Sequence, residues 1–242
     1  YASYASIFAP PLSQIRRFDG SLFDKPIDGS NLEAGIKGEW NGGLLNGSLA
    51  LFNIRQSSPL FAGSSPLIPS CCYVEGTSSS RGVETELDGY LTRHWQLGMG
   101  YTFNVSHQAS LQDSSAPVLQ TRAPRHLLKF WTNYQLPGGW SRWSVGADLH
   151  AQTRNYQNGL ACAALTDTAG KCLGPMVAYR ATQGFYAAAD LRLAYRLSSS
   201  WQLAASFNNV FDRTYYQTIG SPQSGSWYGE PRNVVVSLHG SL

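Results

Sequence analysis

The feature that most constrains this chain is an alternation of apolar and polar residues over runs that are long for strands. From Trp95 to Val105 every second residue is apolar or aromatic, and the residues between them, such as Gln96 and Asn104, are polar or glycine. A period of two indicates β-strands with one apolar face. Strands of soluble proteins usually have about five or six residues, whereas strands that cross a membrane need about nine to eleven. The run lengths therefore favour a transmembrane β-barrel.

Ten such strands can be placed, and together they predict an all-β fold with one antiparallel sheet. Their expected ranges are 1–8, 30–40, 44–55, 81–92, 95–107, 126–136, 141–153, 183–197, 201–213 and 228–242. The four tight connections are 41–43, 92–94, 137–139 and 198–200, and the five long polar ones are 9–29, 56–80, 108–125, 154–182 and 214–227. Short turns on one side and long loops on the other are typical of outer-membrane barrels, in which the short turns are periplasmic.

Tryptophan residues mark the same short turns. Four of the seven tryptophans lie directly beside one of them: Trp40, Trp95, Trp140 and Trp201. An indole ring is stable at the headgroup level of a membrane, so this placement predicts a periplasmic aromatic girdle. A soluble β-sandwich or propeller, the alternative fold, would have to bury every apolar strand face between sheets.

Charge is scarce, because 14% of the residues are charged against about 25% in soluble domains. The net charge of +3 is scattered and forms no basic stripe, so binding to nucleic acid is not expected. No apolar stretch approaches the roughly 18 residues of a membrane helix. No Walker loop, GxSxG sequence or metal-spaced histidine pair occurs, so we predict no catalytic residue, no metal site and no enzyme activity.

The four cysteines fall into two local groups. Nine residues separate Cys162 from Cys172, which is a reasonable loop for a disulfide in an oxidising compartment, and we treat this pair as a candidate disulfide. The adjacent Cys71 and Cys72 could bond to each other, bond across loops, or stay reduced. The sequence leaves these alternatives open.

Five segments, in this order and spacing, resemble successive barrel segments of TonB-dependent ferric-siderophore receptors, with the greatest similarity to receptors for pyoverdine, ferrichrome and coprogen. They are Asn31–Glu39, Arg81–Leu87, Pro124–Lys129, Asn208–Tyr216 and Tyr228–Asn233. The resemblance implies a 22-stranded barrel that crosses the bacterial outer membrane many times. It also implies that the protein takes up a ferric siderophore with energy relayed by TonB.

The resemblance further implies that residues 1–242 are the C-terminal portion of such a barrel and carry its last ten strands. The signal peptide, the plug domain and the TonB box are then absent from these residues, and TonB would be contacted through that N-terminal part. Outer-membrane lipid, lipopolysaccharide and the barrel assembly machinery are the other implied partners. We expect no transport by this portion alone.

Ligand contacts in such receptors come from aromatic and basic residues of the upper wall and loops, beside those of the plug. We select as ligand-binding candidates Arg180, Tyr186, Tyr215, Tyr216 and Trp227. Arg180 and Tyr186 share the parity of the lumen face of their strand. Arg154, Tyr156, Tyr179 and Tyr228 are further candidates of the same kind. The alternative for about half of the whole set is a place in the outer aromatic girdle.

Two other functions remain open from the residues alone. An autonomous ten-stranded barrel with protease activity would need convergent acidic and histidine groups on its rim. A passive porin would need a lumen dense in opposed charges, and the low charge argues against it.

Overall fold

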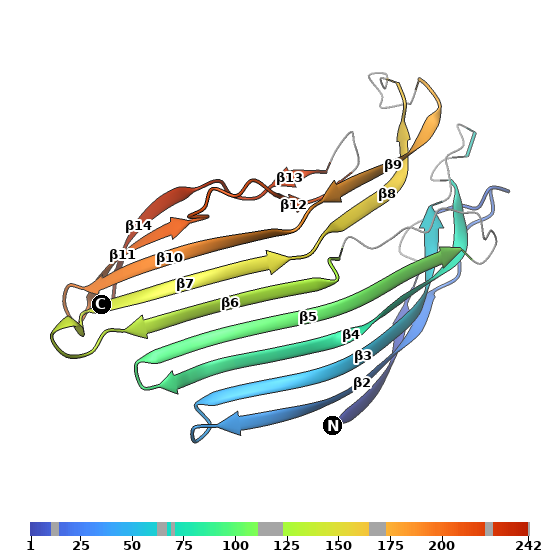
Figure 1. The fold of residues 1–242 in the computed structure, drawn as a ribbon. Coiled ribbons are helices and arrows are strands. Elements are labelled where there is room, and N and C mark those ends of the chain that lie inside the picture. The colour runs from blue at the N-terminus through green and yellow to red at the C-terminus, as the bar shows by residue number, and fades with distance from the viewer. Residues whose placement is uncertain are drawn as a thin grey trace.

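The computed structural model describes residues 1–10, 15–61, 67–68, 71–110, 123–164, 173–220 and 225–241. Ten strands form one curved antiparallel sheet (Figure 1), in which adjacent strands pair in the order β1-β2-β3-β4-β5-β6-β7-β10-β11-β14. Their bounds are β1 Ala2–Ala9, β2 Ile27–Trp40, β3 Leu45–Phe61, β4 Tyr73–Thr92, β5 Trp95–Ser110, β6 His126–Gln135, β7 Trp143–Gln152, β10 Tyr186–Arg196, β11 Trp201–Asn208 and β14 Asn233–Gly240. The all-β antiparallel fold predicted from the alternation is confirmed, with a strand in each of the ten expected places.

Two small hairpins extend from the long-loop side of the sheet. The first pairs β8 (Asn155–Cys162) with β9 (Met176–Gln183), and the second pairs β12 (Tyr216–Thr218) with β13 (Trp227–Tyr228). On the short-turn side, a single 3-10 turn, η1 (Gly138–Trp140), connects β6 to β7. Among the described residues, no helix has the length and apolar character to cross a membrane.

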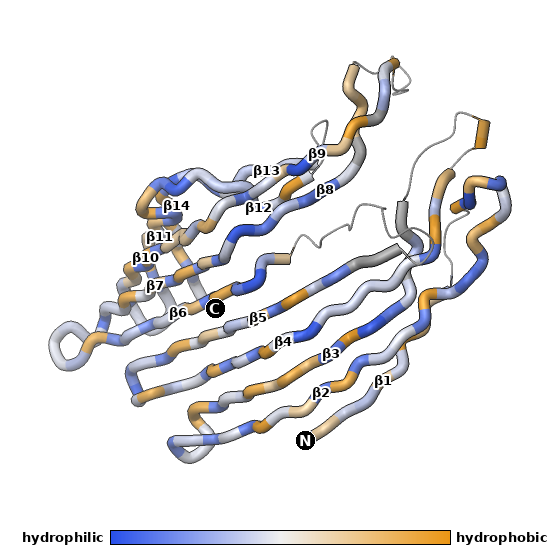
Figure 2. Tube along the Cα trace, turned by 45° about the vertical axis from the view of Figure 1, so that its right-hand side comes forward, coloured by the Kyte–Doolittle hydropathy of each residue, from blue (hydrophilic) through white to orange (hydrophobic). Residues whose placement is uncertain are grey.

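The strand register gathers the apolar residues on one face of the sheet. Val83 lies opposite Phe103, Val145 opposite Leu193, and Phe207 opposite Val234. Figure 2 shows the resulting alternation of hydrophobic and hydrophilic positions along the strands. Large side chains of this face stay uncovered; Ile36 is 68% exposed and Val236 is 66% exposed. Hydrocarbon is the environment that stabilises such a face, because water would leave a large apolar area unburied.

The opposite face carries the polar and charged residues. Glu84, Glu86 and Asp88 on β4 lie opposite Thr102, Gly100 and Gly98 on β5. On the neighbouring strands, Lys129 lies opposite His150, and Asp148 lies opposite Asp190. This polar face is the one that lines the interior of a barrel in the membrane.

The backbone conformation of the turn at residues 41–43 lets the chain reverse direction beside Trp40, one of the four tryptophans of the aromatic girdle. Asn41, Gly42 and Gly43 have φ angles of 55°, 68° and 85°, and Asn and Gly are the residues that best tolerate this left-handed region. The ring of Trp40 lies over Gly38 and Gly47, where the lack of a side chain gives it room. Trp40, Trp95, Trp140 and Trp201 are between 41% and 65% exposed, as expected of side chains at a membrane interface.

Several strand ends differ from the prediction. β3 and β4 continue beyond 55 and before 81, pairing as far as Phe61 opposite Tyr73, because backbone pairing there needs no apolar face. β11 ends at Asn208, since the next residue, Asn209, has a φ of 47°. β14 begins only at Asn233, two residues after Pro231, which cannot donate to the ladder. The segments 154–182 and 214–227, expected as loops, contain the two hairpins.

One disulfide bond in the structure decides between the alternatives that the sequence left open for Cys71 and Cys72. Cys71 and Cys72 bond to each other, and both are buried where β4 meets the segment that contains Arg16. Cys162 is also disulfide-bonded. Its expected partner, Cys172, lies outside the described residues, so the pairing of these two stays a prediction.

The sheet has two open sides. β1 stands at one end of the strand order and β14 at the other, and within the part of the chain that the structure describes they do not pair with each other. Unpaired N–H and C=O groups are not tolerated in hydrocarbon. In a membrane the edges at β1 and β14 would have to be paired, either with further strands or with each other.

Candidate ligand-binding site

A cavity of about 380 Å³ opens on the long-loop side of the sheet. It exists because the neighbouring strands end at different heights: β6 begins at His126, opposite Phe103, whereas β5 continues to Ser110. The β8–β9 hairpin rises on the other side (Figure 1). This cavity is lined mainly by polar and basic residues of β5, of the hairpin and of the segments just before β6 and β8, among them Asn104, Ser106, Arg125, Arg154, Tyr156 and Arg180.

Backbone and hydroxyl contacts fix the β5 wall of this cavity. Asn104 Oδ1 accepts hydrogen bonds from Ser80 Oγ at 2.7 Å and from Ser106 Oγ at 3.0 Å. The backbone N–H of Asn104 donates to the carbonyl of Arg125 at 2.8 Å, which holds Arg125 at the mouth of the cavity. His126, the next residue, turns to the apolar face and contacts Tyr101 and Phe103.

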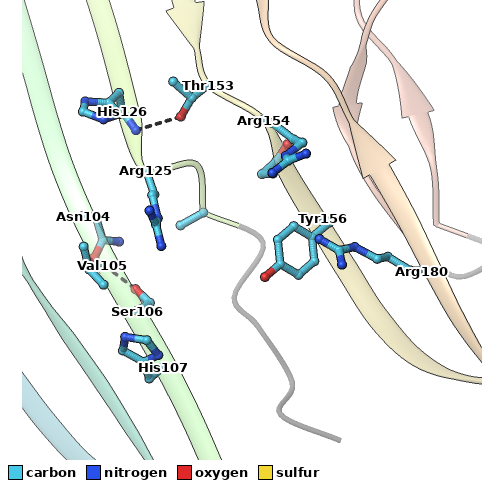
Figure 3. Close-up of a pocket in the computed structure, with 12 residues that line it drawn as sticks. Asn104, Val105, Ser106, His107, Arg125, His126, Thr153, Arg154, Tyr156 and Arg180 are labelled. Atoms are coloured by element: carbon cyan, nitrogen blue, oxygen red, sulfur yellow. Dashed lines mark hydrogen bonds between the residues drawn. The ribbon is translucent and has the colours of Figure 1, made fainter.

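The hairpin wall presents a stacked arginine. The Arg180 guanidinium lies 3.8 Å from the centre of the Tyr156 ring, and the strand register brings the two onto one face, since Arg180 pairs with Asn158 and Tyr156 with Thr182. Figure 3 shows this pair across the cavity from Arg125. A stacked guanidinium keeps its N–H edge free, so it can still donate two parallel hydrogen bonds to an oxyanion.

The cavity is cationic. Arg125, Arg154 and Arg180 all line it, and no aspartate or glutamate does so among the described residues. Within that same part of the chain, the ion pairs that form do not include any of these three arginines. An arginine side chain keeps its charge at every physiological pH, so the cavity attracts anions.

A second feature of the long-loop side is a tyrosine stack on the polar face. Tyr186 and Tyr215 stack with ring centres 4.2 Å apart at 16°, and Tyr186 is only 2% exposed. The Tyr186 hydroxyl donates to Gln152 Oε1 at 3.2 Å, and Gln152 Nε2 donates to Asn155 Oδ1 at 3.2 Å. Because Asn155 lines the cavity, this chain of hydrogen bonds connects the stack to it.

A third feature is the β12–β13 hairpin. Tyr216 and Tyr228 stack with ring centres 4.6 Å apart, and their hydroxyls lie 3.1 Å from each other. Trp227 beside them is 69% exposed. The hairpin is attached to the first one, because the Tyr216 backbone N–H donates to Gln183 Oε1 at 2.7 Å.

The buried Asn209 holds the loop that carries these tyrosines. Its Nδ2 donates to the carbonyls of Arg213 and Glu230, both at 2.9 Å, and its Oδ1 accepts the Arg213 N–H at 2.8 Å. The backbone N–H of Asn209 donates to Asp190 Oδ1 at 2.6 Å. One side chain thus ties together both ends of the loop, while the backbone joins them to β10.

The two loop tyrosines have altered acidity. Burial is the main cause that raises the pKa of Tyr215, and the nearby Asp190 carboxylate adds to it. The hydrogen bond with the Tyr228 hydroxyl is the main cause that raises the pKa of Tyr216. Both phenols are therefore neutral at physiological pH and act as hydrogen-bonding groups rather than charges.

The five residues selected from the sequence fall into three places. Arg180 lines the cavity, Tyr186 and Tyr215 form the buried stack, and Tyr216 and Trp227 belong to the β12–β13 hairpin. Their role as ligand contacts stays a prediction.

The selection omitted several residues that line the same cavity, among them Asn104 and Arg125. Asn104 lies within β5 and Arg125 just before β6, both distant in sequence from the other candidates. Arg125 stands in the Pro124–Lys129 segment, and its position just before a predicted strand is the signal that could have identified it.

The comparisons with known proteins agree with this geometry. Residues 1–210 match the family described as TonB dependent receptor-like, beta-barrel. The ferric-pyoverdine M114 receptor PbuA of Pseudomonas sp. strain M114 is 36% identical over 242 residues, which are 98% of this chain and 27% of that receptor. The ferripyoverdine receptor of Pseudomonas aeruginosa is 32% identical over 244 residues, 98% of this chain and 28% of that receptor.

A solved structure shows the same fold. The crystal structure of the P. aeruginosa ferripyoverdine receptor bound to ferripyoverdine aligns with a TM-score of 0.79 at 29% identity, over 99% of this chain and 30% of that one. The chain thus spans less than a third of the length of these relatives, all of which are receptors. The family match covers most of the residues, and it fits the apolar outer face and the tryptophan girdle. The chain belongs to the TonB-dependent receptor-like β-barrel family of the bacterial outer membrane.

Proposed function

We propose that this chain is part of an outer-membrane receptor that takes up a ferric siderophore with energy relayed by TonB. The observation that carries the proposal is the identity of 36% over 98% of the chain to a protein named as a ferric-pyoverdine receptor. The cationic cavity on the long-loop side supports it, because the long loops of outer-membrane barrels are extracellular. A ligand arriving from outside the cell meets that side first.

We also propose that residues 1–242 form the last ten strands of a 22-stranded barrel. The two open sides of the sheet, at β1 and β14, support this arrangement. The plug domain and the TonB box would then lie outside residues 1–242, and TonB would act on the receptor through the plug domain and the TonB box. Outer-membrane lipid and lipopolysaccharide would contact the apolar face, and the barrel assembly machinery would insert the wall.

An autonomous ten-stranded barrel, whether a protease or a porin, needs direct pairing between its first and last strands. The strand order instead keeps β1 and β14 at opposite ends of the sheet. Since the relatives are receptors, we propose no catalytic role for the chain.

The test is iron uptake in a bacterium that lacks its own siderophore receptors and expresses the complete gene containing these residues. We expect radioactive iron to enter from at least one ferric siderophore of a panel that includes ferric pyoverdine, and uptake to stop when tonB is deleted. Residues 1–242 expressed alone should support no uptake. Uptake that continues without TonB, or no uptake from any chelate, would contradict the proposed function.

A further inference from the structure

The cationic cavity groups three arginine side chains, an arrangement that uptake of a ferric siderophore does not by itself require. Three guanidinium groups, those of Arg125, Arg154 and Arg180, share a space of about 380 Å³ that no acidic residue lines among the described residues. Grouping like charges without a counter-ion is unfavourable. An arrangement of this kind gains stability when an anion occupies it.

The size of the cavity indicates which part of a ligand it can hold. Cavities for whole drug-sized molecules range from about 300 to 1,000 Å³, so this one is at the small end. A ferric chelate is a bulky ligand, because several donor groups surround the metal. The volume suits an arm of the chelate better than its metal centre.

The chemistry of the walls indicates the kind of arm. Arginine binds carboxylates through two parallel N–H···O bonds, and stacking on Tyr156 fixes the plane of the Arg180 guanidinium. Asn104 adds a side-chain amide whose oxygen is already occupied by two serine hydroxyls, so its NH₂ group is the part left to donate. A carboxylate has the oxygens to accept from both kinds of donor.

Residues of both faces of the sheet line the cavity. Asn104 and Ser106, which alternate with Phe103 and Val105 along β5, belong to the polar face. Val105 and His126 also line the cavity, and their strand positions are those of the apolar face. A lipid A phosphate offers similar chemistry to a carboxylate, so lipopolysaccharide binding is measured beside binding of the chelate.

We propose that this cavity binds a peripheral carboxylate of the ferric chelate, while the iron centre stays outside it, so that the receptor selects anionic chelates over neutral ones. This inference rests on the proposed function, and it concerns the selectivity of the same receptor. Arg125 holds the arm from the β6 side, and Arg154 and Arg180 hold it from the hairpin side (Figure 3).

The experiment compares two ligands that differ at one end only. They are the ferric complexes of one linear trihydroxamate, its terminal amine capped either with an acetyl group, which is neutral, or with a succinyl group, which adds a carboxylate. The iron centre is identical in both. Dissociation constants are measured by fluorescence quenching on the complete, detergent-solubilised receptor, and heat-modifiable electrophoretic mobility confirms that each variant is folded.

We expect the wild-type receptor to bind the succinyl form about tenfold more tightly, the lower range for a hydrogen-bonded charge. The variant R125Q/R154Q/R180Q should lose this preference, so that it binds the succinyl and acetyl forms with equal affinity. R125K/R154K/R180K should retain part of the preference, because lysine keeps the charge and loses the paired geometry. The matched control is Arg93→Gln, an exposed arginine of a short turn, which should behave as wild type.

Equal affinities in the wild type, failure to bind either form, or a preference that survives in the triple glutamine variant would each overturn the inference. So would a triple variant that loses lipopolysaccharide binding but still prefers the succinyl form, because the cavity would then serve a lipid headgroup. TonB-dependent uptake without a preference removes only this inference. Absence of uptake from every chelate of the panel contradicts the proposed function itself.

Discussion

Tyr215 and Tyr216 are neighbours in sequence, yet they stack on different partners in different surroundings. Tyr215 lies on Tyr186, with ring centres 4.2 Å apart, and Tyr216 lies on Tyr228, with ring centres 4.6 Å apart. The interplanar angles, 16° and 22°, are similar. The exposed fractions of the two partner rings differ, because Tyr186 is 2% exposed and Tyr228 is 65% exposed.

The difference teaches how a long loop is held on a barrel wall. Successive residues of an extended chain point to opposite sides, so one ring of the pair faces the wall and the other faces the hairpin. The two stacks have similar geometry but stabilise the loop to different extents, since apolar burial supplies most of the free energy of an aromatic contact. We expect the loop to depend on Tyr186 and Tyr215 and to tolerate changes at Tyr228.

The largest effect is expected from Tyr186→Ala. Removing a buried aromatic ring leaves a cavity and exposes the lower side of Tyr215, which should lower the free energy of unfolding by about 3 kcal/mol. Guanidinium unfolding of the complete receptor in micelles measures the change. A loss below about 1 kcal/mol would mean that the buried stack does not hold the loop.

Asn209→Ala should have the next largest effect, about 2 kcal/mol, because three side-chain hydrogen bonds disappear in a buried place and alanine does not favour the left-handed backbone found there. The measurement is the rate at which a protease cleaves the loop between β11 and β14. Asn209→Gly is the matched control. It accepts the backbone conformation, so the difference between the two variants isolates the backbone contribution from that of the hydrogen bonds.

Tyr228→Ala should lower the free energy of unfolding by about 1 kcal/mol or less, because the ring is largely exposed and its contact adds little burial. The same guanidinium titration applies, and Tyr186→Ala is the reference. If the two variants lose equal stability, burial does not distinguish the stacks and the comparison is wrong.

The smallest effect concerns acidity. Tyr228→Phe removes the hydroxyl that raises the pKa of Tyr216, so that pKa should fall toward its ordinary value of about 10, as measured by NMR of ring-labelled tyrosine. The sign follows from linkage: a pKa raised in the folded state stabilises the hairpin below the ordinary pKa, and this stabilisation is lost as pH rises through the raised pKa. No change in the Tyr216 pKa would contradict the hydrogen bond as its cause.

The sequence predicted best the parts of the chain that meet the membrane. Lipid requires one apolar face on every strand, so the alternation from Trp95 to Val105 was enough to locate β5 and its apolar face. Above the membrane that requirement ends. The β3–β4 extension and the β8–β9 hairpin are held by backbone hydrogen bonds, which leave no pattern in the side chains.

The candidate site was predicted only in part for a related reason. Arg180 was selected from its parity, but the cavity also depends on where β6 begins, and that point brings Arg125 to Asn104. Arg180 lies on β9 and Tyr186 on β10, so the expectation that they share one strand was wrong. The parity of Tyr186 was correct, since it lies on the polar face of β10. Tyr186 is buried because Tyr215 covers it, and Tyr215 is held there by the hydrogen bonds of Asn209 to the loop. No periodic pattern in the sequence predicts such long-range contacts.

The β8–β9 hairpin pairs only with itself within the described residues, and it meets the large sheet where β7 and β10 end. Residues can therefore be inserted or removed in pairs across the hairpin while the register of the membrane wall stays as it is. Asn155, Tyr156 and Arg180, three of the residues that line the cationic cavity, lie on this hairpin. Recognition can then diversify by exchange of one short module, as antibodies diversify by loops on a constant framework, and grafting residues 155–183 between related receptors would be a direct way to transfer it.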